Sequence, residues 1–170
     1  MIHLYFGDGK GKTTAAVGLA TRALGNGFPV IFVQFLKGRL SGEIESLSKL
    51  GAVIFRGKSG EKFFSKMNDD EKSQTKKISV QNFEDAISLA QKNQKSLLVF
   101  DEVCAAVNYG VLPKTLVESF LKNAPKELEI VLTGRNPPLS FVEISDYVSE
   151  IKKIKHPFDE GIPARRGVEY

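Results

Sequence analysis

The sequence lacks several features that mark secreted and membrane proteins. It has one cysteine, Cys104, in 170 residues, so no disulfide can form within the chain. Its longest apolar runs are only a few residues, far short of the roughly 20 that cross a bilayer. The chain begins on an apolar stretch, without the basic start of a signal peptide. We therefore expect a cytoplasmic protein with no membrane partner.

Tryptophan and arginine-rich runs are also absent, and the charge balance is mild. The formal net charge is +4 and the pI is about 9.1. Proteins that bind RNA or single-stranded DNA typically interleave basic and aromatic residues, and no such stripe is visible. The basic balance suits a small anionic ligand such as a nucleotide, and we expect no nucleic-acid partner.

Short apolar segments alternate with helical patterns along the whole chain. Strands are expected at 2–6, 30–34, 52–55, 96–100, 129–133 and 146–151, and helices at 12–24, 42–49, 68–93 and 113–122. This alternation predicts an α/β fold with a mainly parallel sheet of about six strands flanked by helices. With no linker or repeat visible, we expect a single domain over 1–170 with an irregular tail at 155–170.

The strongest local signal is the glycine-rich segment from Phe6 to Thr14. It lies between an expected strand and an expected helix, which is the context that a phosphate-binding P-loop needs. Backbone N–H groups and the helix N-terminus would hold the phosphates, Lys12 would reach the outer phosphates, and Thr13 would offer its hydroxyl to Mg²⁺. The standard pattern has glycine five residues before Gly11, where this chain has Phe6, so the loop is a variant. The nucleotide-binding residues predicted are Gly7, Asp8, Gly9, Lys10, Gly11, Lys12, Thr13, Thr14 and Arg135.

Two carboxylates, Asp101 and Glu102, end a later apolar strand. Carboxylates at this edge of a parallel sheet lie beside the phosphate loop and can hold Mg²⁺ or Mn²⁺, directly or through water. Thr13, Asp101 and Glu102 are therefore the predicted metal residues, and Lys12, Thr13 and Glu102 the predicted catalytic ones. The two motifs together predict a P-loop NTPase domain of RecA-like architecture that uses ATP.

The loop at 7–16 resembles that of the ATP:corrinoid adenosyltransferases, the cob(I)alamin adenosyltransferases of the P-loop type. The segments at 33–38, 101–102, 132–135 and 146–150 are also similar to that family, as are the closing residues 155–162 and 164–170. The resemblance covers essentially the whole chain. Some members carry an N-terminal extension before the first strand, and we expect none here. The chain also differs from the family pattern in having Asp8 where asparagine is usual, and in lacking tryptophan near the expected corrin site.

The resemblance implies transfer of the 5′-deoxyadenosyl group of ATP to the cobalt(I) of a corrinoid, with release of triphosphate. The product would be adenosylcobalamin or its precursor. Corrinoid contacts would come from Gln34, Lys37, Phe63 and Phe64. The two phenylalanines would pack under the corrin ring and displace the lower axial ligand of Co(II), which eases its reduction. The resemblance also implies an electron-donating reductase and a homodimer.

Three other functions remain open from the residues alone. A motor-like ATPase would use Glu102 to position water, and would hydrolyse ATP to ADP for a macromolecular partner. A small-molecule kinase commonly brings several arginines to the transferred phosphate, and this chain has few outside its tail. A nucleotide-binding regulator would form no product.

Two single residues and the tail have expected roles of their own. Cys104 lies in a short apolar stretch and is expected to be buried. His156 has no second ligand nearby and is expected to be a structural histidine rather than a metal ligand. The tail, with Arg165 and Arg166, is expected to fold over the base or ribose.

Overall fold

The computed structural model describes residues 1–38, 41–57, 62–93 and 95–169. Its centre is a six-stranded sheet in the order β3-β2-β4-β5-β1-β6, and every pair of neighbours is parallel. The strands are β1 (Ile2–Phe6), β2 (Val30–Gln34), β3 (Val53–Arg56), β4 (Leu97–Asp101), β5 (Glu129–Gly134) and β6 (Tyr147–Glu150).

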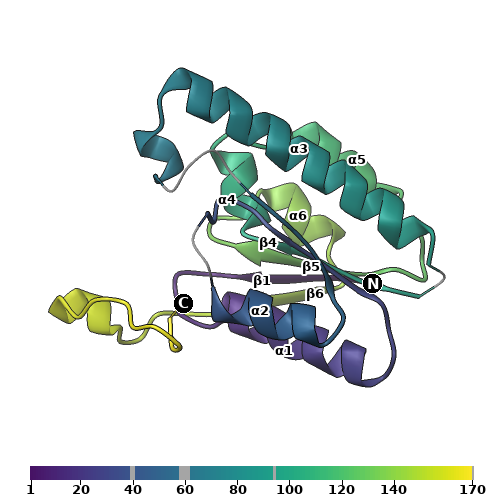
Figure 1. Ribbon diagram of the computed structural model, residues 1–170, viewed down its shortest axis with the longest axis horizontal. Helices are drawn as coiled ribbons and strands as arrows, with labels where there is room; N and C mark the ends of the chain where they lie inside the picture. The colour runs from purple at the N-terminus through teal and green to yellow at the C-terminus, as the bar shows by residue number, and fades with distance from the viewer. Residues whose placement is uncertain (39–40, 58–61, 94, 170) are drawn as a thin grey trace.

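Helices cover both faces of the sheet (Figure 1). On one face lie α1 (Lys12–Gly25) and α2 (Gly42–Lys49). The other face carries α3 (Asp69–Gln91), α4 (Val103–Asn108), α5 (Lys114–Lys122) and α6 (Leu139–Ile144). Two short 3₁₀ helices, η1 (Phe64–Lys66) and η2 (Pro157–Glu160), lie outside these layers. The α/β fold predicted from the sequence is confirmed.

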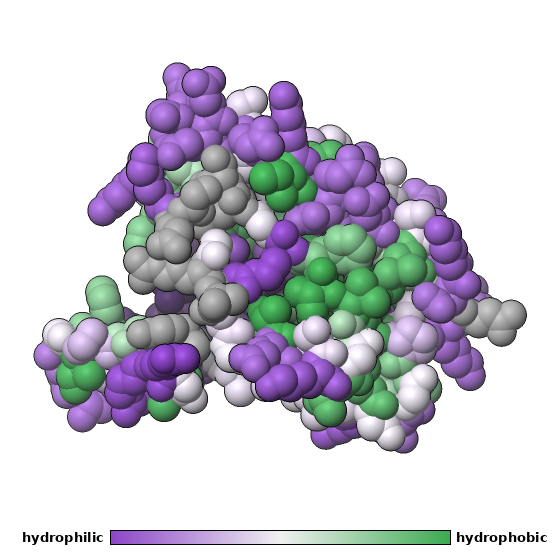
Figure 2. Space-filling view, viewed as in Figure 1, coloured by the Kyte–Doolittle hydropathy of each residue, from purple (hydrophilic) through white to green (hydrophobic). Residues whose placement is uncertain are grey.

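The core has two parts because side chains alternate across each strand. In β2, Ile31 and Val33 pack on the side of α3, whereas Val30 and Phe32 pack on the side of α1 and α2. The outer side of α3 is hydrophilic, and hydrophobic side chains gather between α3 and the α1–α2 layer (Figure 2). Among the described residues, no helix combines the length and the apolar character needed to cross a membrane.

Local sequence signals located most elements to within two residues. The capping box expected at Asn68 and Glu71 is present, since the Asn68 side chain accepts from the Glu71 N–H at 2.8 Å and the Glu71 carboxylate accepts from the Asn68 N–H at 2.9 Å. The sequence patterns do not predict α4 and α6, each of six residues. Helices this short have little periodicity of their own and are stabilised by packing.

The parallel strands bring their carboxyl ends to one edge of the sheet. β1 therefore delivers the glycine loop, β4 delivers Asp101, and β2 delivers Gln34 to the same region. One strand, β5, separates β1 from β4 and ends there in Gly134. Ligands of open parallel sheets bind at this edge, so the fold alone identifies it as the place to look for a site.

Candidate active site

The glycine loop at residues 7–11 packs against the chain that follows β6. Gly9 donates its N–H to the Ile151 carbonyl at 2.8 Å, and a Cβ at Gly9 would lie 2.7 Å from that oxygen. A Cβ at Gly7, whose φ is +119°, would overlap the same carbonyl. Glycine is therefore needed at both positions for this close approach. The Gly9 N–H already has a partner, so a phosphate would bind to other N–H groups, among them those that lack intrahelical partners at the start of α1.

Lys12 is folded over the loop, with only 8% of its surface exposed. Its Nζ donates to the Gly9 carbonyl at 2.7 Å. Burial lowers the Lys12 pKa, and the nearby Arg135 guanidinium lowers it further. Bound phosphate would supply the negative charge that this partly desolvated ammonium lacks.

Asp101 is fully buried beneath the loop and links it to the sheet. Its Oδ1 accepts from the hydroxyls of Thr13 on α1 and Thr133 on β5, both at 2.8 Å. Its Oδ2 accepts from Lys37 Nζ at 2.9 Å and from Gln34 Nε2 at 3.3 Å. The Asp101 carboxylate therefore fixes the position of the Thr13 hydroxyl that the sequence predicts as a metal ligand.

Glu102 follows Asp101 in a left-handed conformation, with φ +62°. Its N–H donates to Thr133 Oγ1 at 2.9 Å, which holds this unusual turn. Burial raises the Glu102 pKa, and the neighbouring Asp101 charge raises it as well, whereas Lys37, Lys12 and Arg135 act in the opposite direction. A bound cation would favour the ionised carboxylate here.

Asp8 and Arg135 lie on the outer side of the loop. The Asp8 carboxylate accepts from the Lys153 N–H at 3.0 Å, and this hydrogen bond is the main reason that the Asp8 pKa is lowered. Arg135 Nη2 donates to the Asp8 carbonyl at 3.5 Å. The Asp8 side chain is therefore bonded to the segment after β6.

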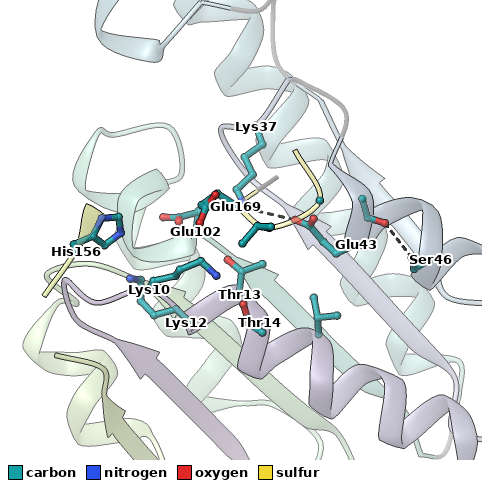
Figure 3. A pocket seen from close by; sticks show the side chains of 15 residues that line it. Lys10, Lys12, Thr13, Thr14, Lys37, Glu43, Ser46, Glu102, His156 and Glu169 are labelled. Atoms are coloured by element: carbon teal, nitrogen blue, oxygen red, sulfur yellow. Dashed lines mark hydrogen bonds and ion pairs between the residues drawn. The ribbon is translucent and has the colours of Figure 1, made fainter. Parts of the chain in front are cut away.

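A cavity of about 500 Å³ opens over the loop (Figure 3). Lys10, Lys12 and Thr13 line it on the side of α1, while Glu102 and Lys37 line it from the edge of the sheet. Its remaining lining comes from the loop, α1, α2 and the tail: Gly11, Thr14, Val17, Gly42, Glu43, Ser46, His156, Gly167, Val168 and Glu169.

The tail reaches this cavity with residues that sequence patterns did not single out. Glu169 accepts from the Arg165 N–H at 2.7 Å and from its guanidinium at 3.0 and 3.2 Å, and this pairing lowers the Glu169 pKa to about 2. His156 lines the cavity too, and its Nδ1 accepts from the Phe158 N–H at 3.1 Å, the structural role expected for it. Thr133 is another residue that sequence reasoning left without a role.

The four side chains expected to contact corrinoid fall into two groups. Gln34 and Lys37 belong to the hydrogen-bond network of Asp101. Phe63 and Phe64 lie at η1, outside the residues that line the cavity. Phe63 is 73% exposed, and the Phe64 ring lies 6.2 Å from that of Tyr109 at the end of α4. Exposed aromatic rings of this kind can cover an apolar ligand face.

Cys104 is buried, as expected, and packs directly under Gly134. Burial raises the Cys104 pKa to about 12, so the thiol stays protonated. A Cβ at Gly134 would lie 2.5 Å from the Cys104 Cβ, and the Gly134 φ is +150°. Glycine at this strand end lets α4 pack closely against β5.

We expect Gly134→Ala to lower the free energy of unfolding by about 2–4 kcal/mol, because the added methyl overlaps Cys104 and alanine disfavours this φ. Urea denaturation followed by circular dichroism measures the change. Gly18→Ala in α1 is the matched control, since no atom beyond its chain neighbours and the backbone of its own helix lies within 4 Å of the added Cβ, and alanine favours helix. Equal losses in the two variants would contradict the packing argument.

Comparison with known proteins gives matches over the whole chain. A family model described as ATP:corrinoid adenosyltransferase BtuR/CobO/CobP matches residues 1–170. A corrinoid adenosyltransferase from Sinorhizobium sp is 36% identical over 167 residues, which cover 96% of this chain and 77% of that protein.

Two enterobacterial relatives match over similar lengths. The corrinoid adenosyltransferase of Escherichia coli K12 is 32% identical over 171 residues, covering 100% of this chain and 85% of its own length. The corrinoid adenosyltransferase CobA of Salmonella typhimurium LT2 is 33% identical over 171 residues, with the same coverage of both chains.

Proposed function

Since the chain belongs to the ATP:corrinoid adenosyltransferase family, we propose that it transfers the 5′-deoxyadenosyl group of ATP to the cobalt(I) of a corrinoid. The observation that carries this proposal is the family match over all 170 residues, together with a phosphate loop whose lysine faces a cavity. The ATPase alternative is not favoured, because these relatives align with the whole of this chain and are named corrinoid adenosyltransferases.

The chemistry requires a loop that stabilises a leaving group. Cobalt(I) attacks the 5′ carbon of ATP, the carbon–oxygen bond breaks, and its electron pair leaves with the triphosphate. Lys12, Lys10 and the N-terminus of α1 line the cavity and would stabilise this charge. Lys12, which is held by the Gly9 carbonyl, would do so as a group already fixed in place. Cobalt(I) is itself the nucleophile, so no side chain has to act as a general base.

The residues at the loop fit a magnesium ion. The Thr13 hydroxyl donates its proton to Asp101, so its oxygen lone pairs remain available, and the Glu102 carboxylate lines the same cavity. The described residues hold no cluster of three His, Cys, Asp or Glu side chains, which suits an ion that takes few protein ligands and completes its shell with phosphate oxygens and water. Thr13 and Glu102 would hold the ion, with Asp101 acting through Thr13. Magnesium bound there would neutralise charge on the departing triphosphate.

The aromatic pair at η1 is the proposed contact for the lower face of the corrin. Phe64 packs near Tyr109, and Phe63 extends into solvent beside it. Apolar side chains under the ring would exclude the lower axial ligand of Co(II), and axial ligation sets the reduction potential of such metals. Gln34 and Lys37, also predicted to contact corrinoid, are held by Asp101 in this structure.

We expect Phe64→Ala to slow adenosylation that starts from Co(II) by roughly tenfold, equal to about 1.4 kcal/mol of barrier. The same variant should have a much smaller effect when cobalt is chemically reduced to Co(I) beforehand. Rates from both starting states, measured anaerobically, test this difference. Phe28→Ala, which removes another exposed phenylalanine just after α1, should change neither rate. Equal slowing from both starting states would contradict an axial-ligand role.

The family resemblance supports four further proposals. The protein would act in the cytoplasm, form a homodimer, receive electrons through a reductase, and take part in cobalamin biosynthesis. The proposed functional unit is one domain over residues 1–170, whose closing residues line the nucleotide cavity.

Product analysis separates the proposed function from its alternatives. In ³¹P NMR of the protein with ATP, Mg²⁺ and reduced corrinoid, we expect triphosphate, formed only when corrinoid is present. ADP formed without corrinoid would favour the ATPase, and ADP that requires another acceptor would favour a kinase.

A further inference from the structure

The Asp101 carboxylate has no unoccupied position for a metal ion. Each of its oxygens accepts two hydrogen bonds, Oδ1 from Thr13 and Thr133 and Oδ2 from Gln34 and Lys37. A carboxylate has about four lone-pair positions, so the four donors saturate it. A cation that approaches Asp101 must therefore replace one of them.

Lys37 is the donor that can leave. Asp101 is fully buried, Gln34 and Thr133 are each no more than 1% exposed, and Thr13 is anchored in the first turn of α1. Lys37, in contrast, has a side chain that is 34% exposed and lines the cavity. Of the four described side chains that donate to Asp101, Lys37 is the one that carries a charge. Lys37 thus provides at Asp101 the positive charge that a divalent cation would otherwise provide.

The chain holds Lys37 there at a cost in backbone strain. Leu36, the residue before it, has φ +60°, which is uncommon for a residue that is not glycine. The Phe35 N–H donates to the Asp101 carbonyl at 3.0 Å and fixes the start of this turn. Strained backbone of this kind clusters at functional sites, which supports a role for Lys37 beyond that of a surface lysine.

Lys37 also separates the negative charges of the site. Its Nζ lies 2.9 Å from Asp101 Oδ2 and 3.9 Å from Glu43 Oε1. Without this ammonium group, the Asp101 and Glu43 carboxylates would both lose the cation beside them. Lys37 therefore lowers the attraction of this edge of the cavity for a free divalent cation.

We propose that Lys37 is a built-in counter-ion of Asp101 that keeps free divalent cations out of the site. The cation then enters only with the nucleotide, whose phosphates draw Lys37 Nζ away from Asp101 and toward the leaving triphosphate. Lys37 thereby becomes a second cationic group on the leaving group, beside Lys12. This inference depends on the proposed function in one respect, which is that the ligand is a nucleotide triphosphate bound together with a divalent cation.

The test is binding of Mn²⁺ alone, without nucleotide or corrinoid, measured from the electron paramagnetic resonance signal of free Mn²⁺. Wild-type protein is expected to bind Mn²⁺ weakly. Lys37→Gln removes the charge and shortens the side chain, which uncovers Asp101 Oδ2, and it should bind Mn²⁺ roughly tenfold more tightly or better. Lys37→Arg keeps the charge and should bind as weakly as wild type. Lys37→Met serves the same purpose as the glutamine variant if that variant does not fold.

The double variant Lys37→Gln/Asp101→Asn is the matched control, and it should lose the gained affinity because the uncovered carboxylate is gone. Equal Mn²⁺ affinity in wild type and Lys37→Gln would overturn the inference, as would tight binding of free Mn²⁺ by wild type. Because no corrinoid is present, this result is independent of whether adenosyl transfer occurs. Loss of adenosyl transfer in wild type would contradict the proposed function alone.

Discussion

Lys12→Ala is expected to lower kcat for adenosyl transfer by about a hundredfold to a thousandfold, the range found when one fixed group is removed from developing negative charge. Lys12 is almost fully buried at the base of the cavity, with its Nζ held over the loop by the Gly9 carbonyl. Negative charge on the triphosphate grows as the carbon–oxygen bond breaks, so the loss should be larger in kcat than in KM for ATP. Anaerobic steady-state kinetics with reduced corrinoid measure both constants.

Lys10→Ala is the matched control for that prediction. Lys10 lines the same cavity from the same loop but is exposed to solvent, where water screens its charge. Its loss should cost less than about tenfold. If both variants lose activity equally, the general positive charge of the loop would matter and the buried position of Lys12 would not. Full activity in Lys12→Ala would remove the loop from the mechanism.

Glu102→Gln is expected to have the second largest effect, a decrease of about tenfold to a hundredfold in activity at limiting Mg²⁺. The substitution keeps the size of the side chain and the Glu102 N–H bond to Thr133, so the left-handed turn should survive. It removes the carboxylate charge that would help to hold the ion beside Thr13. The apparent Mg²⁺ affinity, taken from activity titrations, should fall, and high Mg²⁺ should restore part of the rate.

The control for this metal role is Glu169→Gln on the tail. Glu169 lines the same cavity, but its carboxylate is bonded to Arg165, so its loss should leave the Mg²⁺ dependence unchanged. An unchanged Mg²⁺ titration in Glu102→Gln would exclude Glu102 as a metal residue. A similar shift in both variants would indicate a general effect of cavity charge.

The parts of the site that the sequence predicts are those encoded within a few consecutive residues. The loop between Gly7 and Thr14 needs only a strand before it and a helix after it, and Asp101 needs only to end a buried strand. Parallel pairing then brings the two to one sheet edge, which accounts for the Thr13 bond to Asp101. The fold class followed from the same alternation of strands and helices.

Contacts between distant segments could not be predicted in this way. The pairing of Lys37 with Asp101 depends on the left-handed turn at Leu36, and leucine gives no signal of that conformation. The approach of Ile151 to Gly7 and Gly9 depends on how the chain leaves β6. The tail is expected from the sequence to fold over the nucleotide, but residues 167–169 have no periodicity, so only the structure shows that these three residues line the cavity. The roles of the predicted site residues remain predictions for the variants described above.

The most direct test of the central claim is one anaerobic reaction that contains the protein, ATP, Mg²⁺ and chemically reduced cobalamin. Absorbance follows formation of the cobalt–carbon bond, and triphosphate is determined in the same sample. The account predicts the spectrum of an adenosylated corrinoid, with one triphosphate released for each bond formed. ATP consumed to ADP without any cobalt–carbon product would contradict it.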